Sequence, residues 1–439
     1  MSPLLIGILI ALGTIVILAC GIPIALGLGL VSIVFLLVFD GLGSLDILAD
    51  TFFAGIAEFS LVSIPMFIVM GAAVASSPAG KDLYEALDRW LYRVPGGLIM
   101  SNIGACAIFA ALSGSSPATC AAIGKMGIPE MRKRGYPSGL ATGSIAAGGT
   151  LGILIPPSVT MIVYGIATET SIGRLFIAGL LPGVMLTGLF VAWSLFTAWR
   201  NGFTFNVTEQ GFTLKQKLEV LPRVLPFLII IAGVLFVLYG GVATPSEAAG
   251  VAAMFVLVLV AVIYKVWQPE KIWSIINSSM KESVMIMMII AASALFAYTL
   301  SSLYVTQSIA ESIANMDVNR WVLMGLINLF LLVAGFFLPP VAVIVMTAPI
   351  LLPIIEIAGF DPYWFAVIFT INMEIGLITP PVGLNLYVIN GIAPDVPLPT
   401  VLKGAIPYVL CMIVAIIILC IFPEIATWLP TALMGTAIT

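Results

Sequence analysis

Long apolar segments, separated by short polar stretches, run along nearly all of this 439-residue chain. A membrane-spanning helix uses about 20 mostly apolar residues, so the chain has room for roughly ten to twelve membrane segments. Hydropathy predicts simple helices over residues 4–20, 23–39, 59–77, 174–199, 225–241, 246–266, 283–302 and 400–428. Two blocks, 95–170 and 320–395, have a more complicated pattern. We therefore expect an all-α polytopic membrane protein.

Composition excludes several classes of chemistry. Only 9% of the residues are charged and 61% are apolar, whereas soluble domains carry about 25% charged residues. The chain has no histidine, which excludes His-dependent nucleophiles and His-ligated metals. Its five cysteines lie in apolar runs without a Cys-x-x-Cys pair. This pattern predicts that they pack as small buried hydrophobic residues and have no redox or metal-binding role. The net charge is −4 with no long basic tract, so nucleic acid is not expected as a partner.

The distribution of basic residues predicts an orientation in the membrane. If Lys81 is cytoplasmic, following the helices places 14 of the 17 basic residues on the same side, as the excess of Lys and Arg in cytoplasmic loops requires. Arg174 and Arg320 fall on the other side, and Lys125 lies within a membrane segment. This orientation places both termini outside the cytoplasm.

The chain contains an internal repeat. Five landmarks coincide when the sequence is shifted by 224 residues: Glu58 with Glu282, Pro129 with Pro353, Gly135 with Gly359, Gly152 with Gly376, and Pro156-Pro157 with Pro380-Pro381. A constant offset without a gap indicates duplication. Because Glu58 lies outside and Glu282 inside in the predicted orientation, the two copies are expected to be inverted. Inverted repeats with broken helices are typical of secondary transporters, whose sites lie near the midplane of the membrane.

The segment from Pro95 to Arg134 predicts a re-entrant helical hairpin. Its second half, Pro117 to Pro129, is about 18 Å long as a helix, which is shorter than the roughly 30 Å hydrocarbon core. The hairpin would turn at Ser113-Gly114-Ser115-Ser116. Two short ordinary helices joined by a tight turn remain the alternative, because the first leg alone is nearly long enough to span.

The chemistry of this turn suits ions. Ser116 is a good N-cap and Pro117 fits the first helical position, so the positive end of a helix dipole would point at the turn and favour an anion. Carbonyl and hydroxyl oxygens of Ser113, Gly114 and Ser115 could equally bind a hard cation such as Na⁺. Ordinary loop chemistry is the alternative, but a solvated loop at membrane depth is expected only where it lines a cavity.

Each hairpin is followed by a predicted broken helix. In the first copy, Gly148, Gly149 and Gly152 weaken a helix that Pro156-Pro157 stops. In the second copy a hairpin turns at Gly335 to Pro340, and the next helix breaks at Thr379-Pro380-Pro381. Four polar residues interrupt the apolar run around the second break: Asn372, Glu374, Thr379 and Asn385.

Glu374 is the strongest single candidate for a functional residue. A carboxylate in a membrane helix costs several kcal/mol unless it meets partners, water or an ion, which favours a role in organising the site over a hydrogen-bonded structural role. Glu247 follows Pro245 near a helix start, where a carboxylate favours the helix dipole, so a structural role is expected there.

The segment after residue 77 predicts an amphipathic helix. Leu83, Leu87, Trp90 and Leu91 lie on one face between charged residues, which is typical of a helix lying along the membrane interface. We expect an arm beside the first hairpin; a docking site for a soluble partner is the alternative.

Four motifs resemble one protein family over nearly the whole chain. GSSPATCAAIG, LGILIPPS, GVATPSEAAGVAA and NMEIGLITPPVGLNLYVI are similar to the large membrane subunit, the M or DctM type, of tripartite ATP-independent periplasmic (TRAP) transporters. The resemblance implies a multi-pass protein of the bacterial inner membrane that is not an enzyme. It implies Na⁺-driven import of organic acids, chiefly C4-dicarboxylates, other carboxylates and sialic acid, with two or more Na⁺ as coupling ions and no organic cofactor. Two partners are implied: a small four-helix membrane subunit and a periplasmic solute-binding protein.

The resemblance also implies an elevator motion, in which a transport domain slides against a scaffold. On that basis we divide the chain into scaffold helices 1–80, an arm 81–94, a first hairpin and broken helix 95–170, scaffold helices 171–302, a second arm 303–319, a second hairpin and broken helix 320–395, and a C-terminal helix 396–439. Carried over residue by residue, Na⁺ would bind at Ser113, Gly114, Ser115, Gly148, Gly149, Thr150, Gly335, Leu338, Gly376 and Thr379. The substrate would lie between them, at Ser115, Ser116, Pro157, Pro340, Glu374 and Asn385.

One position departs from the family pattern. Members often carry an acidic residue at the second hairpin tip, in a Leu-Asp-Pro-like context, whereas this chain has Leu338-Pro339-Pro340. No ligand role is carried over for that carboxylate. Two alternatives stay open: a stand-alone Na⁺/carboxylate symporter of similar architecture, and an intramembrane enzyme, for which the sequence offers Ser and Glu but no His and no paired catalytic Asp.

Overall fold

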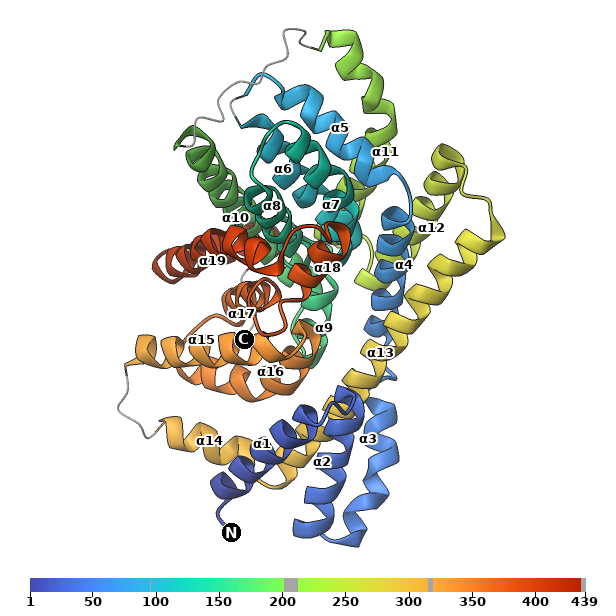
Figure 1. Cartoon of the computed structure of the whole chain (residues 1–439). Coiled ribbons are helices and arrows are strands. Elements are labelled where there is room, and N and C mark those ends of the chain that lie inside the picture. Colours follow the sequence, from blue (N-terminus) through green and yellow to red (C-terminus); the bar gives the residue numbers. More distant parts are fainter. Residues whose placement is uncertain (95, 201–211, 315–318, 436–439) are drawn as a thin grey trace.

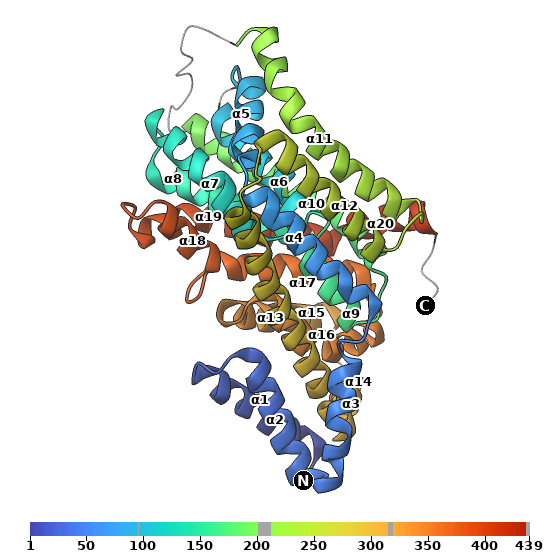
Figure 2. The same ribbon diagram turned by 90° about the vertical axis from the view of Figure 1, so that its right-hand side faces the viewer.

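The computed structural model describes residues 1–94, 96–200, 212–314 and 319–435. The first residue of the first hairpin block, part of the second arm and the end of the C-terminal segment lie outside these described ranges. Figures 1 and 2 show an assembly of helices from two views. The first copy contains these helices: α1 (Pro3–Ala19), α2 (Ile24–Phe39), α3 (Leu48–Ala54), α4 (Ser63–Ala75), α5 (Ala79–Leu91), α6 (Gly97–Ser113), α7 (Ser116–Lys133), α8 (Ser138–Thr150), α9 (Val159–Ala167) and α10 (Ile172–Arg200).

The second copy repeats this order. Its helices are α11 (Leu214–Tyr239), α12 (Pro245–Tyr264), α13 (Pro269–Ser302), α14 (Val305–Ala314), α15 (Arg320–Phe337), α16 (Pro340–Ile357), α17 (Pro362–Leu377), α18 (Leu384–Ile392) and α19 (Leu398–Ile421), followed by α20 (Glu424–Met434). Short 3-10 turns cover Leu42–Ile47, Phe59–Val62 and Leu151–Ile153. Within the described residues every regular element is helical, so the predicted all-α class is confirmed.

Seven helices of the described residues are long and apolar enough to cross a membrane: α10, α11, α12, α13, α15, α16 and α19. An eighth span results if Leu42–Ala54 and Phe59–Ala75, which meet at a bend of 51°, are counted as one. This is fewer than the ten to twelve segments expected, because α1, α2 and α6 have only 16 or 17 residues. The chain is nevertheless a multi-pass membrane protein.

Several helix boundaries differ from those that hydropathy predicts. Helix α11 begins at Leu214, well before residue 225, because Thr213 and Gln216 form a capping box at a polar start. Helix α13 begins at Pro269, well before residue 283. The single helix predicted over 400–428 divides into α19 and α20 at Phe422 and Pro423. Hydropathy misses polar first turns because these do not need to enter the hydrocarbon.

The duplication predicted from sequence is present in the structure. Corresponding helices begin at Gly97 and Arg320, Ser116 and Pro340, Ser138 and Pro362, and Val159 and Leu384, close to the offset of 224. Both Pro-Pro pairs, 156–157 and 380–381, have a cis peptide bond. Gly135 and Gly359 share a left-handed backbone, with φ of 83° and 73°.

The two copies pack into each other. Helices α6 and α7 form hairpin 1, and α15 and α16 form hairpin 2. The half-helix α9 packs against α16 of the second copy, and its counterpart α18 packs against α7 of the first copy. Helices α8 and α19 pack together in the same way, as do α10 and α17. The open end of hairpin 1 lies near α5, whereas the open end of hairpin 2 lies near α14 (Figure 1).

The length argument for hairpin 1 is wrong in one respect. Helix α7 continues through Pro129 to Lys133 and contains 18 residues, which is about 27 Å rather than the 18 Å inferred from the proline positions. Length alone therefore does not make this leg too short to cross. Its ends define the hairpin, because Gly114, with φ of 58°, and Ser115 reverse the chain between α6 and α7.

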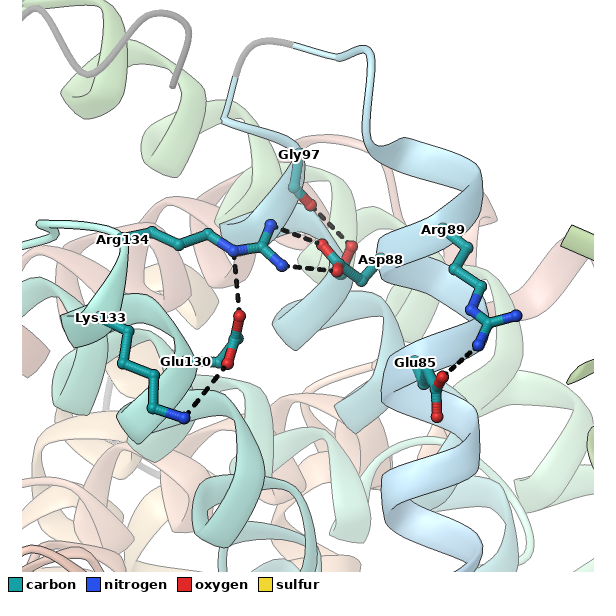
Figure 3. Close-up of polar contacts among 8 residues, drawn as sticks. Glu85, Asp88, Arg89, Gly97, Glu130, Lys133 and Arg134 are labelled. Atoms are coloured by element: carbon teal, nitrogen blue, oxygen red, sulfur yellow. Dashed lines mark hydrogen bonds and ion pairs between the residues drawn. The ribbon is translucent and has the colours of Figure 1, made fainter. Parts of the chain in front are cut away.

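The arm helix α5 is amphipathic in a different way from the prediction. Asp82 and Asp88 are buried, whereas Trp90 is 47% exposed. Figure 3 shows the reason for Asp88: Arg134, at the end of hairpin 1, donates two hydrogen bonds to its carboxylate at 3.1 and 2.8 Å. Arg134 also donates to Glu130 at 3.1 Å. The arm is thus fixed to the hairpin by paired charges as well as by apolar packing.

Candidate functional site

The tip of hairpin 1 is built from hydroxyl and carbonyl oxygens. The Thr119 hydroxyl donates to the Ser115 carbonyl oxygen at 2.9 Å, and the Ser113 and Thr119 hydroxyls are 2.8 Å apart. Ser113 and Thr119 are both buried. This network holds the peptide groups between the two helices in fixed directions, so that their oxygens are preorganised.

The first broken helix passes directly against this tip. A Cβ added to Gly152 would lie 2.7 Å from the Ser115 carbonyl oxygen, so only glycine permits this approach. Gly148 and Gly149 have another role than the predicted break: α8 remains helical through Thr150, and these glycines face Cys106 and Cys120 on the two legs of hairpin 1. The break itself covers residues 151–158.

The second copy repeats this contact at its own hairpin. A Cβ added to Gly376 on α17 would lie 2.7 Å from the Gly335 carbonyl carbon. Gly335 is in the last turn of α15, and Leu338 and Pro339 form the turn before α16 begins at Pro340. The Thr379 hydroxyl donates to the Ile375 carbonyl oxygen at the break. Both predicted breaks therefore lie beside the predicted hairpin tips.

One cavity of about 420 Å³ receives both tips. Residues 113–118 line it from hairpin 1, and residues 339–341 line it from hairpin 2. Helices α2, α4 and α13 close the opposite side, and Leu377 and Leu384 flank the second break. Glu282 of α13 is the single ionisable side chain among these lining residues of the described chain. The cavity therefore joins the tips of both hairpins to helices outside them.

Comparison with known families identifies the chain. Residues 11–425 match the model of the tripartite ATP-independent periplasmic transporter, DctM component. The chain belongs to this DctM family. The family consists of transporter permease subunits, which confirms the resemblance inferred from sequence and the expectation that the chain is not an enzyme.

Relatives and solved structures agree with this assignment. The chain is 36% identical to the C4-dicarboxylate TRAP transporter large permease protein DctM of Pseudomonas aeruginosa, over 85% of this chain and 86% of that protein. It is 29% identical to the sialic acid TRAP transporter large permease protein SiaM of Vibrio cholerae, over 88% and 90%. In fold it resembles the YdaH transporter of Alcanivorax borkumensis, with a TM-score of 0.66, 16% identity and 90% of each chain covered.

Glu374 is the most unusual residue of this DctM-family chain. Its side chain is completely buried in α17, and neither carboxylate oxygen has a hydrogen-bond partner among the described residues. A buried carboxylate without a partner costs several kcal/mol, so such groups take up a proton or a cation. On the same helix Asn372 donates to Asn328 of α15 at 2.6 Å, while its own amide oxygen is likewise buried without a described partner.

Asn385 connects the two copies. Its amide nitrogen donates to the Ser116 hydroxyl at 2.8 Å and to the Ala146 carbonyl oxygen at 3.2 Å. Ser116 begins α7, so a residue of the second broken helix fixes the start of the first hairpin's second leg. The amide oxygen of Asn385 is buried and has no partner among the described residues.

The structure brings together part of the predicted substrate set. Ser115, Ser116 and Pro340 line the cavity. Pro157 lies beside the first tip, because its carbonyl oxygen is 3.0 Å from a Cβ added to Gly114. Glu374 and Asn385 are completely buried and are not among the lining residues of the cavity in the described chain.

Sequence reasoning missed three contributors to this site. Thr119 was overlooked because a threonine one turn inside a helix has no distinctive pattern. The sequence marks Gly152 as a helix breaker and a landmark of the repeat, but not as the point of contact with the hairpin tip. Glu282 was used as a landmark of the repeat, although its position as a mid-helix carboxylate in α13 is the same signal that singled out Glu374.

Proposed function

We propose that this DctM-family permease subunit uses Na⁺ to import an organic acid, with the cavity between the two hairpin tips as the place where the acid binds. The observation that carries the proposal is this shared cavity. Oxygen-rich and helix-start groups from hairpin 1 meet the tip of hairpin 2 there, and helix starts stabilise a carboxylate while bare oxygens suit Na⁺.

Na⁺ coupling is supported by the unpartnered oxygens around the second break. Glu374, Asn372 and Asn385 together present four buried oxygens without a described partner. Buried polar oxygens are nearly always satisfied in proteins, and hard cations prefer oxygen ligands. Two ion sites are proposed. One uses Ser113, Gly114, Ser115, Gly148, Gly149 and Thr150, and the other uses Gly335, Leu338, Gly376 and Thr379. Glu374 would organise the second site.

The transport step follows from the location of the cavity. Helices α2, α4 and α13 form one wall of the cavity, and the hairpins form the other. Sliding of the hairpins along that wall would expose the cavity to each side of the membrane in turn, which is the proposed elevator motion. In the proposed orientation both termini are periplasmic.

The proposed partners and cargo follow from the family. A small four-helix membrane subunit and a periplasmic solute-binding protein would complete the system. A C4-dicarboxylate is the first cargo to test, because the Pseudomonas aeruginosa relative is named for it. Sialic acid is the second, from the name of the Vibrio cholerae relative.

Reconstitution tests the proposal. The chain would be placed in proteoliposomes with its small subunit, and the binding protein would be added outside with radiolabelled succinate or sialic acid. Uptake should require both an inward Na⁺ gradient and the binding protein. Equal uptake with an inward K⁺ gradient replacing Na⁺ would refute Na⁺ coupling. Uptake by the chain alone would support the stand-alone symporter instead.

A further inference from the structure

An apolar groove and a charged pocket, neither of which shares a residue with the hairpin cavity, follow one another along α11 and α12. The groove runs between α11 and α12, which pack side by side (Figure 2). It has a volume of about 470 Å³ and is lined by Pro222, Leu225, Pro226, Ile229, Phe255 and Leu259, among others. Leu225, Ile229 and Phe255 are 45%, 60% and 53% exposed.

A separate charged pocket adjoins this groove along the same two helices. It has a volume of about 380 Å³ and is lined by Lys81, Asp82, Glu85, Arg223, Tyr264 and Lys265, among others. Arg223 lies one residue from Pro222, and Ile263 of the pocket lies one helical turn from Leu259 of the groove. Along both helices the residues that line the pockets therefore change from charged to apolar over about 10 to 15 Å.

The charges in this pocket do not cancel. Asp82 accepts a hydrogen bond from the Tyr264 hydroxyl at 2.8 Å and lies 3.6 Å from Arg223. Glu85 is paired with Arg89. Both carboxylates are thus already neutralised, whereas Lys81 and Lys265 have no ion-pair partner among the described residues. Two uncompensated ammonium groups therefore remain in the charged pocket that adjoins the apolar groove.

We infer that this groove binds one phospholipid with an anionic headgroup, whose phosphate lies between Lys81 and Lys265 and whose acyl chain covers Pro226, Ile229 and Leu259. An amphiphile matches both pockets, because the charged pocket and the apolar groove follow one another along the same two helices. An anionic lipid fits because each basic residue near the membrane surface attracts such lipids by about 1 kcal/mol. The bound lipid would brace the arm α5 against α11 and α12, next to the contact of Asp82 with Tyr264.

Native mass spectrometry of the purified full chain tests this inference. The protein in mild detergent would be offered phosphatidylglycerol or phosphatidylcholine at equal concentration. The wild type should retain one phosphatidylglycerol in preference to phosphatidylcholine. The double variant Lys81→Ala/Lys265→Ala should lower that retention by about 30-fold. Lys271→Ala/Lys403→Ala removes two exposed lysines of the same predicted membrane side outside the pocket and should change nothing.

A second pair of variants tests the apolar groove. Leu259→Trp fills the groove and should also expel the lipid, whereas Leu257→Trp, on the same helix but outside the groove, should not. Equal retention of the two lipids, or equal loss in the lysine variants and their control, would overturn the inference. Release of the lipid on addition of the small membrane subunit would also overturn it, because the groove would then be a protein interface.

Discussion

The two copies share their layout but distribute polar groups in opposite ways. In the first copy the hairpin tip is polar, with Ser113, Ser115 and Ser116, while the broken helix carries a single polar residue, Thr150, at the four positions compared. In the second copy the tip is Leu338-Pro339-Pro340 and the broken helix is polar. At the offset of 224, Gly148 corresponds to Asn372, Thr150 to Glu374, Ile155 to Thr379 and Met161 to Asn385.

This difference between the copies separates two kinds of feature. Features that both copies keep belong to the shared architecture, and features that differ belong to the chemistry of each site. Close approach of a glycine to the hairpin occurs in both copies, at Gly152 and Gly376, so it belongs to the architecture. Polar side chains have diverged, so the two proposed ion sites are chemically different. The contact between Asn385 and Ser116 then joins the polar helix of one copy to the polar tip of the other.

The largest expected effect is the loss of uptake when Glu374 is replaced. Its counterpart in the first copy, Thr150, provides the comparison. Glu374→Gln removes the buried charge that a cation would neutralise, and should lower Na⁺-driven uptake by about 100-fold, or ~2.7 kcal/mol. Thr150→Val removes only a hydroxyl that bonds to the Ala147 carbonyl oxygen, and should change uptake by less than about threefold. Uptake kinetics at saturating Na⁺ would measure both, and equal effects would mean that the two positions remain equivalent.

The glycines should behave alike, because their contacts are alike. Gly152→Ala and Gly376→Ala each place a methyl group against hairpin backbone, and each should lower stability by about 1–3 kcal/mol. Thermal unfolding in detergent measures this. Gly188→Ala and Gly325→Ala are the controls, since each glycine lies within a long helix with open space around it. Loss of stability at only one of the two contact glycines would show that the architectural equivalence is incomplete.

Replacing Asn385, which donates a hydrogen bond to Ser116 of the other copy, should lower stability more than replacing its counterpart Met161. Asn385→Ala removes the donor to the buried Ser116 hydroxyl and should cost about 1–2 kcal/mol. Its counterpart Met161→Leu conserves volume in the core and should cost less than about 1.5 kcal/mol. A matched thermal-unfolding series would compare them. An unchanged melting temperature for Asn385→Ala would remove the contact from the interactions that hold the copies together.

The smallest effects are expected at the tips. Ser115→Ala and Thr379→Ala should each raise the Na⁺ concentration for half-maximal uptake by about threefold, as expected when one oxygen of several around a cation is lost. Pro339→Ala, at the position corresponding to Ser115, should leave it unchanged because no side-chain oxygen is lost. The Na⁺ concentration dependence of uptake tests whether these hydroxyl oxygens bind Na⁺. A normal dependence in both hydroxyl variants would place the ions elsewhere.

Sequence alone predicts the repeat, the two chain reversals and the Pro-Pro breaks, but neither the full length of α7 nor the helical conformation of Gly148 and Gly149. Gly and Pro act locally, so Gly114, Pro339-Pro340 and the two Pro-Pro pairs at the breaks could be interpreted without knowing the fold. The longer helices α11 and α13 were underestimated because their polar first turns lie beyond the apolar pattern. The burial of Asp88 could not be foreseen, because it depends on Arg134, which lies 46 residues away.

The site was predictable only in part for a similar reason. Ser115, Ser116 and Pro340 lie at chain reversals, and each reversal of a repeat is a natural candidate for the cavity. Which side chains then meet across the copies, such as Asn385 and Ser116, depends on how two inverted halves interlock. A sequence has no local signal for that geometry.

The interlocking has a consequence for biogenesis. Because α9 packs against α16 and α7 against α18, a nascent chain that has emerged through residue 167 has none of these partners yet. Its turn at residues 113–116 therefore stays without these contacts until more than 200 further residues have been synthesised. Chaperones or the insertion machinery would have to shelter that half during the interval, and truncation anywhere before Asn385 should leave a product that the cell degrades.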